Sequence, residues 1–569
     1  MISVSNKEWS ERKFDDNLVD KCSQDNNFSR IISKLVISRK FNQEEINTIN
    51  DLNDADFSNV FKYNKDFINS VDLVIKNIKN NSKICILGDY DVDGSCSTAL
   101  LIKFFKSINH PFIFYIPDRV KDGYGPSVKL FRKILKEFPK LIIMVDCGSN
   151  SNEAINFLNE NKIDSLIIDH HQINKPYPKA SSIINPKKGK NYVEYDYLCA
   201  TSLTYFFLDL LIDKIKINKN FQLKDYLIYV LLATVCDVMP LRYINRFIAI
   251  KTLNKFDLNK VIPIKKIYEC LDINNKVSIN DLGYLIGPIL NAGGRLGKSN
   301  FAAKLLSSDN EDEIEIITKK LVDLNQKRKN FEQRVLDNIN YKKIQKEEKN
   351  VIVYYDPTIN EGLIGIIAAR LNDFFNKPAI VLTNSKNILK GSARSIFGFD
   401  IGLVIKNALD NKLIIQGGGH KMAAGFTVTK DNIIAFDKFI NISYDKMSKN
   451  YDFKSFFYDS KLSSSGLNKI FNDEINKLYP FGSGNPEPIF LFEQLRISKV
   501  KILKNKHISN LFTSKDGFSI PSISFNSINE TVGEYLMNYK KEINVIGFLK
   551  YNFWNNKKIL QLVVRDLII

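Results

Sequence analysis

The chain has 569 residues, of which 44% are hydrophobic and 25% are charged, and its formal net charge is +18 at pH 7. The length exceeds a single hydrophobic core and predicts three or four domains. No apolar run approaches the ~20 residues of a membrane span. Seven cysteines without a Cys-x-x-Cys pair argue against a disulfide framework or a zinc knuckle. We therefore expect a reduced, cytoplasmic protein.

The positive charge indicates a polyanionic partner such as nucleic acid. The positive charge can also result from amino-acid usage, because the sequence is rich in Lys, Asn and Ile, as an AT-rich genome would encode. Composition leaves both explanations open, and the motifs must decide between them.

Residues 1–65 are polar and irregular, with a short helix expected near residues 43–52. We expect this segment to be a leader packed on the first domain; a disordered tail is the alternative.

Residues 66–255 alternate apolar runs with helical patterns. Residues 84–87 and 141–145 are typical of buried strands, and residues 126–138 and 152–161 carry apolar side chains at helical spacing. This alternation predicts a parallel α/β sheet, in which ligands bind beyond the carboxyl ends of the strands.

Four short acidic segments each follow an apolar stretch, at residues 89–94, 146–148, 169–171 and 236–237. Strands that end in carboxylates gather negative charge at one edge of a sheet, where the carboxylates repel one another unless cations lie between them. Oxygen ligands with one or two imidazoles suit Mn²⁺ or Mg²⁺. The pattern therefore predicts a two-metal phosphoryl hydrolase.

The first acidic segment, Asp-Tyr-Asp-Val-Asp-Gly, also matches the opening of an EF-hand calcium loop. The distal Glu of such a loop is absent, and a strand precedes the segment where a helix would be needed. Gly88 and Gly94 permit a tight turn, and residues 95–101 predict a helix start with hydroxyls available to cap it.

The chain has five histidines, and two of them, His170 and His171, directly follow Asp169. Adjacent side chains on an extended segment point to opposite sides, so we expect one imidazole to bind metal and the other to face substrate.

Residues 256–345 predict a helical connector that ends in one long charged helix over residues 311–344. A second α/β domain follows at residues 346–445, with strands at 351–355 and 379–382, a helix at 362–375, and a glycine-rich segment before His420.

Residues 446–569 contain short alternating runs, such as 518–525 and 542–549, which predict a small β-barrel. Basic and aromatic residues interleave there, as in barrels that bind single strands. We expect most of these aromatic rings to lie in the core, and Phe553 and Trp554 to be exposed in a loop because asparagines surround them.

In this order, the motifs resemble the DHH phosphoesterase superfamily and, within it, the RecJ family of bacterial single-strand-specific exonucleases. The likeness extends from about residue 80 to the C-terminus. It is carried by residues 88–94, 145–148, 169–171, 233–241, 290–297, 391–395, 418–425 and 480–488.

The resemblance implies an α/β protein with a parallel-sheet DHH catalytic domain (66–255), a connector with a long helix (256–345), a DHH-associated nucleic-acid-binding domain (346–445) and an OB-fold-like single-strand-binding barrel (446–569). The implied activity is a single-stranded-DNA-specific 5′→3′ exonuclease that releases 5′-mononucleotides by two-metal hydrolysis, in DNA recombination and repair.

The resemblance also implies two divalent ions, with Mn²⁺ preferred and Mg²⁺ as the other candidate. Asp146 would bridge the ions, Asp89 would support them, and His171 would face the scissile phosphate. The implied catalytic and metal-binding set is Asp89, Asp91, Asp93, Asp146, His170, His171 and Asp237.

Substrate selection needs further residues, and forked guanidinium groups suit phosphate oxygens. In the family pattern, Arg119, Ser392 and Arg394 hold a 5′-phosphate and Arg295 lies near the backbone of the strand. The glycines before His420 expose backbone N–H groups, and His420 would complete a phosphate cradle. For each arginine, an ordinary surface ion pair is the alternative.

The implied partners are single-stranded DNA, a helicase and a single-strand-binding protein, with no membrane and a monomeric state. Three alternatives remain: a DHH-family oligonucleotide or cyclic-dinucleotide phosphodiesterase, an inorganic pyrophosphatase, and a binding module with a dead site. The complete ligand set and the additional C-terminal domain favour the exonuclease.

Overall fold

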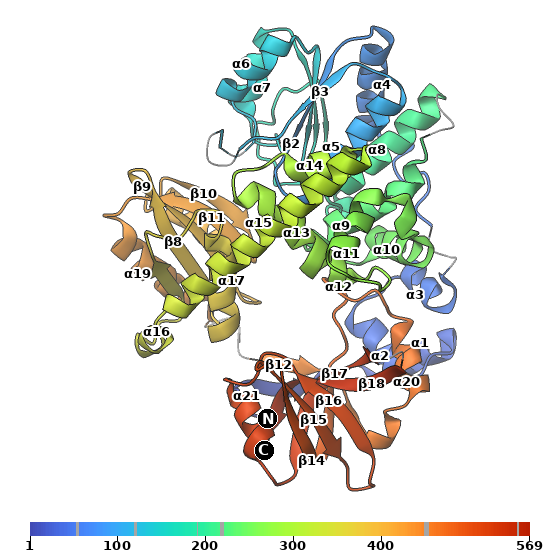
Figure 1. The fold of residues 1–569 in the computed structure, drawn as a ribbon, viewed down its shortest axis with the longest axis vertical. Helices are drawn as coiled ribbons and strands as arrows, with labels where there is room; N and C mark the ends of the chain where they lie inside the picture. The colour runs from blue at the N-terminus through green and yellow to red at the C-terminus, as the bar shows by residue number, and fades with distance from the viewer. Residues whose placement is uncertain are drawn as a thin grey trace. The chain divides into compact units, whose positions relative to one another are not determined.

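The computed structural model describes residues 1–52, 56–118, 122–123, 125–189, 192–216, 221–448, 455–554 and 557–569. The chain forms two compact units (Figure 1). One unit comprises Met1–Ser58, Val238–Lys255 and Lys454–Ile569, and the larger one comprises Asn59–Asp237 and Phe256–Phe453. Among the described helices, none combines the length and the apolar character needed to cross a membrane.

The larger unit begins with a five-stranded sheet in which all neighbouring strands are parallel, as predicted. Every residue of the two strands predicted from apolar runs is buried, because helices cover both faces of the sheet (Figure 1). The strand order is β3 (Phe112–Tyr115), β2 (Ile84–Gly88), β4 (Leu141–Val145), β5 (Asp164–Ile168) and β6 (Ser182–Ile184). The helices are α4 (Lys65–Lys79), α5 (Val92–Ser107), α6 (Val128–Ile134), α7 (Asn152–Glu160), α8 (Ala200–Ile215) and α9 (Leu227–Cys236).

The connector is helical, as predicted, and packs on the first domain through contacts of α14 with α5. The long helix α15 ends at Asn338, six residues before the predicted end, because Asn340 caps a separate short helix by accepting from the Lys343 backbone N–H. The connector helices are α11 (Ile262–Cys270), α13 (Gly287–Arg295), α14 (Phe301–Ser307), α15 (Glu311–Asn338) and α16 (Tyr341–Lys346).

The second α/β domain is a mixed five-stranded sheet covered on both faces. One face packs against α17 (Ile364–Phe375) and the other against α18 (Ile401–Asp410) and α19 (Ile433–Ser448). The strand order is β10 (Gln416–His420), β11 (Ala423–Val428), β9 (Ile388–Arg394), β8 (Ala379–Ser385) and β7 (Ile352–Tyr355). The glycine-rich segment is therefore an edge strand, β10.

The smaller unit contains the predicted C-terminal barrel, in which five strands close through pairing of the first with the fourth in sequence. The five are β14 (Phe490–Leu503), β15 (His507–Thr513), β16 (Ser519–Ser524), β17 (Ile543–Trp554) and β18 (Lys557–Ile568). The barrel also packs against α20 (Lys469–Asn476) and α21 (Thr531–Asn538).

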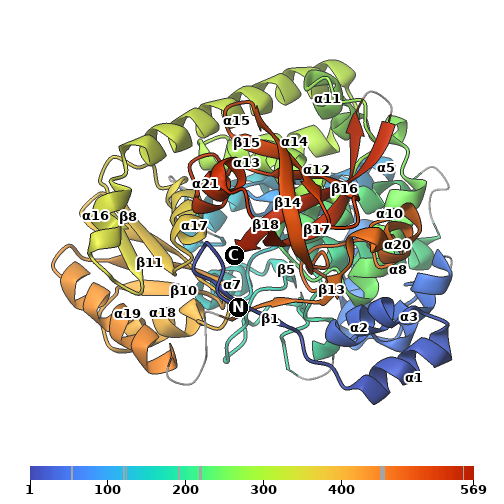
Figure 2. The ribbon, with the colours of Figure 1, turned by 90° about the horizontal axis from the view of Figure 1, so that it is seen from below.

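Residues 1–58 of the N-terminal segment belong to the unit that contains the barrel, whereas we expected the whole segment to pack on the first domain. Only the end of the segment packs there, with the Phe61 ring stacked on Phe67 at a centroid distance of 4.2 Å. Its helices α1 (Asp16–Asn26), α2 (Arg30–Ser38) and α3 (Gln43–Asn50) form a small group (Figure 2), and strand β1 (Glu8–Glu11) pairs in parallel with β12 (Ser455–Tyr458). Apolar side chains such as Leu35 and Ile49 join the core of the barrel. The amphipathic pattern of these helices predicts a buried face but does not identify its partner.

A buried ion pair holds this segment to α10 (Tyr243–Lys255), which also belongs to the smaller unit. The Arg242 guanidinium donates to both Glu45 oxygens, over N–O distances of 2.7 and 2.6 Å, and to the Lys40 carbonyl oxygen. Glu45 is fully buried. Removing one partner of such a pair leaves an uncompensated buried charge.

We expect Glu45→Ala to lower the free energy of unfolding of this unit by about 3–5 kcal/mol, because Arg242 would keep its buried charge without a counterion. Both tryptophans of the chain, Trp9 and Trp554, belong to this unit, so tryptophan fluorescence during urea denaturation follows its unfolding. Asp20→Ala is the matched control, because its ion pair with Arg30 is exposed and should contribute under ~1 kcal/mol. Equal midpoints for the two variants would contradict this role of Glu45.

Candidate active site

Three of the four acidic segments follow neighbouring parallel strands, as predicted. Asp89 follows β2, Asp146 follows β4 and Asp169 follows β5, and these strands are adjacent in the order β2, β4, β5. The carboxyl ends of parallel strands meet at one edge of the sheet, which is where this class of sheet binds ligands.

The first segment makes a tighter turn than predicted, because α5 already begins at Val92. The Asp91 carboxylate caps the helix by accepting from the Gly94 backbone N–H at 3.0 Å, so the cap is a carboxylate and not a hydroxyl of the following residues. A Cβ on Gly94 would lie 2.5 Å from the Asp89 carbonyl oxygen. Glycine at this position allows the close approach of the two backbones.

Asp93 is held by the first turn of α8. One carboxylate oxygen accepts from the Ala200 N–H at 2.8 Å, and the other accepts from the N–H and the hydroxyl of Thr201 at 2.7 and 2.6 Å. Unpaired N–H groups at a helix start favour negative charge, so this helix fixes a buried carboxylate in place.

Asp237 reaches the site from the end of a helix and not from a strand. It is the residue directly after α9, and its backbone N–H closes the last turn on the Ala233 carbonyl. The expectation that all four acidic segments follow strands was wrong for this one, because a continuous apolar run of this length is also typical of a buried helix.

The predicted ligands converge. Three sets of three side chains could each hold a metal ion. Within each set, every residue offers one ligand atom, and these atoms all lie within 4.8 Å of one another. Asp146 and His170 each belong to two of the sets. The sets are Asp89, Asp91 and Asp146; Asp93, His170 and Asp237; and Asp146, His170 and His171.

Asp146 occupies an unfavourable environment in the site. It is buried, its backbone has φ +60°, and neither carboxylate oxygen has a hydrogen-bond partner among the described residues. Burial, followed by the charges of Asp91, Asp93, Asp89 and Asp237, raises its pKa well above the usual value. Carboxylate oxygens that are buried, crowded by like charges and without hydrogen bonds fit a hard divalent cation, which would offset both the burial and the repulsion.

His170 lies at the centre of the carboxylates. Its Nε2 is 3.3 Å from Asp237, 3.4 Å from Asp146 and 3.7 Å from Asp93. Burial lowers its pKa to about 4, in spite of these charges. The imidazole is therefore neutral near pH 7, which is the form that binds a metal.

His171 lies at the surface of the same cluster. Its Nδ1 is 2.8 Å from Asp169, and this hydrogen bond and the nearby carboxylates outweigh burial and raise its pKa to about 9. The expectation that the two imidazoles point to opposite sides was wrong, because His170 Nε2 and His171 Nδ1 both lie within 3.7 Å of the same Asp146 oxygen.

His420 meets the cluster from the edge strand β10. Its ring stacks on His171 with centroids 6.3 Å apart and an interplanar angle of 26°. This strand is exposed along most of its length and pairs with β11 through Gly417, Gly418 and Gly419, so these glycines form a sheet edge.

Three of the predicted phosphate-binding residues gather around the start of α17. A Cβ on Gly365 would lie 2.9 Å from Arg394 Nη2 and 3.1 Å from Ser392 Oγ, and Arg295 donates to the Gly362 carbonyl at 3.1 Å. Ser392 and Arg394 are two residues apart on β9, so they share one face of the sheet. Guanidinium groups beside the first turn of a helix form an arrangement suited to an anion.

Two parts of the prediction lie outside the described residues. These are Arg119 and the side chains of Phe553 and Trp554. The backbone of Phe553 and Trp554 belongs to strand β17, so the expected loop is a strand end. Phe518 and Phe525, which we did not single out as exposed, are 50% and 54% accessible.

Sequence reasoning missed two residues that position the histidines. Asn185 is fully buried and donates to the His171 carbonyl at 2.9 Å, and Lys187 Nζ donates to the His170 carbonyl at 2.5 Å. Asn185 directly follows β6, so the strand-end rule would have found it if that three-residue strand had been recognised. No signal in the sequence points to Lys187.

Family models match three parts of the chain. The DHH family N-terminal domain matches residues 83–234, the DHHA1 domain matches residues 348–443, and the RecJ OB domain matches residues 458–566. These regions correspond to the parallel-sheet domain, the mixed-sheet domain and the barrel.

The chain is similar over most of its length to curated bacterial exonucleases. It is 30% identical to the single-stranded-DNA-specific exonuclease RecJ of Haemophilus influenzae, covering 84% of this chain and 87% of that protein. It is 28% identical to RecJ of Bacillus subtilis, covering 99% and 71% respectively. The fold matches that of RecJ from Thermus thermophilus crystallised with Mn²⁺, with a TM-score of 0.81, 22% identity, and coverage of 99% of this chain and 79% of that one.

We expect Asp146→Asn to stabilise the metal-free protein and to abolish its stabilisation by Mn²⁺. The substitution removes a buried carboxylate that its neighbours repel, and it also removes a metal ligand. The unsubstituted protein should gain about 2.7 kcal/mol at a Mn²⁺ concentration 100-fold above the dissociation constant. Thermal unfolding followed by circular dichroism in EDTA and in Mn²⁺ measures both effects.

The control is Asp213→Asn, which removes an exposed carboxylate near the end of α8. This variant should keep the full response to Mn²⁺. A metal response retained by Asp146→Asn would contradict the assignment of Asp146 as a ligand.

Proposed function

The chain belongs to the RecJ family, and from this we propose that it is a hydrolase that degrades single-stranded DNA as a 5′→3′ exonuclease and releases 5′-mononucleotides. The observation that carries the proposal is the convergence of carboxylates and imidazoles on Asp146, together with the match of the barrel to the RecJ OB domain. In this family the activity serves DNA recombination and repair.

We propose that two divalent ions bind in this cluster. Asp93, Asp146, His170 and Asp237 would hold one ion, and Asp89, Asp91 and Asp146 the other, so that Asp146 bridges them. Mixed oxygen and imidazole donors favour Mn²⁺, with Mg²⁺ as the second candidate, and the similar fold from Thermus thermophilus has been crystallised with each of these ions.

When bound, two such ions lower the pKa of a water molecule and neutralise charge on the leaving oxygen of an in-line displacement. The side chains prepare this chemistry. The first turn of α8 holds the Asp93 carboxylate in place, and the neutral His170 presents Nε2 as a donor atom. His171 donates from Nδ1 to Asp169, and its raised pKa leaves Nε2–H available to a nonbridging oxygen of the scissile phosphate.

We propose that the site around the start of α17 selects the 5′ end of the strand. Ser392 and Arg394 would bind a terminal phosphate together with Arg119, and Arg295 and His420 would bind the adjacent backbone. This anion site belongs to the same unit as the carboxylate cluster, and His420 stacks on His171, which connects it to the metal ligands.

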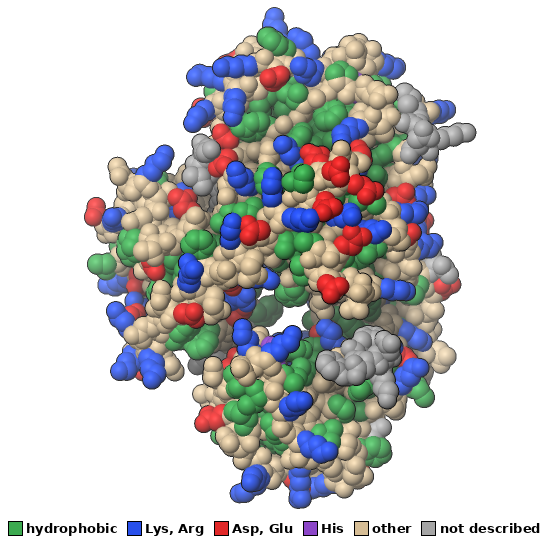
Figure 3. All heavy atoms as spheres, viewed as in Figure 1, with side chains coloured by type: hydrophobic (Ala, Val, Ile, Leu, Met, Phe, Trp, Pro, Cys, Tyr) green, Lys and Arg blue, Asp and Glu red, His purple; other side chains and the backbone are tan. Residues whose placement is uncertain are grey.

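We propose that the barrel binds the single strand. On the face shown in Figure 3, Lys and Arg side chains are spread over the barrel, and the exposed rings of Phe518 and Phe525 supply stacking surfaces. A helicase, a single-strand-binding protein and a monomeric state stay predictions of the family resemblance.

The first test uses purified protein, Mn²⁺ and a single-stranded DNA labelled at either its 5′ or its 3′ end, with a blunt duplex as control. We expect immediate release of a labelled mononucleotide from the 5′ label, none from the duplex, and complete inhibition by EDTA. Asp146→Asn should abolish turnover and retain single-strand binding.

The alternatives give different products. Hydrolysis limited to dinucleotides or very short oligomers would replace the exonuclease with the smaller DHH phosphodiesterase activity. Tight binding of the strand without hydrolysis would indicate a binding module.

A second prediction concerns end selection. Arg394→Gln should raise the KM for a 5′-phosphorylated strand roughly tenfold or more, because a charge-assisted hydrogen bond contributes about 1.5–3 kcal/mol. The KM for a 5′-hydroxyl strand should change little. Steady-state kinetics on the two strands measures the difference.

Lys386→Gln is the matched control, because it removes one positive charge at the exposed turn between β8 and β9 of the same sheet. This variant should treat both strands as the unsubstituted protein does. If Arg394→Gln weakened both strands equally, Arg394 would not recognise the 5′-phosphate.

A further inference from the structure

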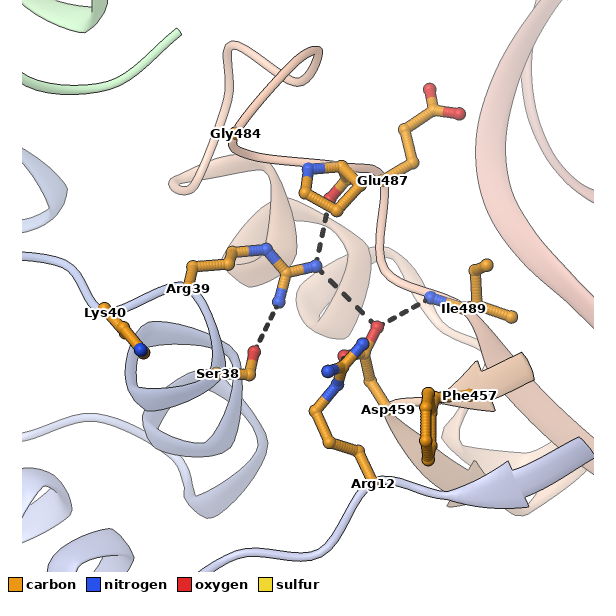
Figure 4. Close-up of a pocket in the computed structure, with 10 residues that line it drawn as sticks. Arg12, Ser38, Arg39, Lys40, Phe457, Asp459, Gly484, Glu487 and Ile489 are labelled. Atoms are coloured by element: carbon orange, nitrogen blue, oxygen red, sulfur yellow. Dashed lines mark hydrogen bonds and ion pairs between the residues drawn. The ribbon is translucent and has the colours of Figure 1, made fainter. Parts of the chain in front are cut away.

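A pocket of about 230 Å³ lies within the smaller unit, where the N-terminal segment meets the start of the barrel domain. Its walls come from the residue after β1, the end of α2 and the following turn, β12, and the loop that precedes β14 (Figure 4). The side chains that give it chemical character are Arg12, Arg39, Lys40, Phe457, Asp459 and Glu487. None of these belongs to the metal cluster.

Arg39 forms the fixed part of the pocket. Its side chain is 4% exposed, its Nη1 donates to Ser38 Oγ at 3.0 Å, and its Nη2 donates to the Pro486 carbonyl at 2.9 Å. These bonds hold the guanidinium in one orientation. Its Nε–H is buried and has no hydrogen-bond acceptor among the described residues.

Arg12 is the accessible part. Its side chain is 41% exposed, and its guanidinium carbon lies 5.4 Å from the centroid of the Phe457 ring. Phe457 is itself 45% exposed. The Arg12 guanidinium therefore lies over one face of a partly exposed aromatic ring in the pocket.

One carboxylate serves both arginines. Asp459 lies 3.4 Å from Arg12 Nε and 3.7 Å from Arg39 Nη2, and it also accepts from the Ile489 backbone N–H at 3.0 Å. Figure 4 shows Arg12 and Arg39 converging on Asp459, whereas the Glu487 side chain points away from them. Two guanidinium groups thus share a single counterion, and Lys40 adds a third cation to the lining.

We propose that this pocket binds one phosphate group of single-stranded nucleic acid, with the adjacent base stacked on Phe457. The proposal rests on the proposed function and adds to it a contact on the strand outside the catalytic unit. A forked guanidinium matches phosphate oxygens, and Arg12, whose side chain is 41% exposed, presents one in the pocket together with the ammonium group of Lys40. The volume suits a phosphate with part of one nucleotide, and an exposed ring beside a cation is the arrangement that binds single strands without sequence preference.

An acidic peptide is the other macromolecule that a positive pocket could attract. The exposed ring favours the nucleic acid, because a base has a flat face to place on Phe457 whereas Asp and Glu side chains have none.

The test measures binding of a fluorescein-labelled oligothymidylate by anisotropy, in EDTA to prevent hydrolysis and over a series of salt concentrations. Arg12→Ala should weaken binding and should lower the slope of log K against log salt by about 0.7, which is the effect of one lost phosphate contact on a single strand. Phe457→Ala should weaken binding roughly tenfold and leave the salt slope unchanged.

Arg30→Ala is the matched control. Arg30 also belongs to the N-terminal segment, but it is exposed, pairs with Asp16 and Asp20, and lies outside the pocket. This variant removes the same charge and should keep both the affinity and the salt slope.

The outcomes separate this inference from the proposed function. Absence of strand binding by the unsubstituted protein would contradict the proposed function itself. If Arg12→Ala and Phe457→Ala bound the strand with the same affinity and salt slope as Arg30→Ala, the proposed role of the pocket would be wrong, and the proposed function would be unaffected. If Arg12→Ala failed to fold, Phe457→Ala would still decide, because its ring is exposed.

A competition arm distinguishes the ligands. A methylphosphonate version of the oligonucleotide, which lacks the backbone charge, should bind Arg12→Ala and the unsubstituted protein equally well. Inorganic phosphate should compete only weakly. The pocket would be an acidic-peptide site if polyglutamate displaced the strand and if Arg12→Ala weakened the binding of polyglutamate but not that of oligothymidylate.

Discussion

Mutual repulsion among carboxylates at the carboxyl end of the parallel sheet is the constraint on which the rest of the catalytic unit depends. Asp146 is buried without a hydrogen bond to either oxygen among the described residues, and its neighbours raise its pKa. A protein does not gain stability from such a group, so its presence points to cation binding. The surrounding contacts oppose the repulsion: the first turn of α8 holds Asp93, and Asp91 caps α5.

The strands of the site could be predicted because their signal is local. Continuous apolar runs that alternate with helical patterns predict parallel buried strands, and the strand-end rule then places Asp89, Asp146 and Asp169 together. Contacts between distant residues have no such signal. The hydrogen bond from Thr201 to Asp93 joins residues 108 apart in the sequence, and no local sequence pattern around either residue predicts this contact.

The same limit explains the N-terminal segment. Its helices have apolar faces that predict burial, yet an apolar stripe packs equally well on any complementary surface. Here the partner is the barrel, which lies more than 400 residues later in the chain. The Glu45–Arg242 pair fixes the same segment to the start of α10, because each charge needs the other once both are buried.

Metal-ion hydrolysis does not by itself distinguish a strand end from any other phosphodiester, because the ions act on the phosphate alone. Recognition of the substrate therefore depends on groups that bind parts of the strand which do not react. Arg394 and Ser392 lie within the catalytic unit, where a 5′-phosphate would position the first phosphodiester. The Arg12–Arg39 pair lies in the other unit and shares one counterion, so it retains positive charge for a further phosphate. Each further phosphate contact increases the affinity for a single strand and the salt dependence of its binding, whereas hydrolysis depends on the metal ligands alone.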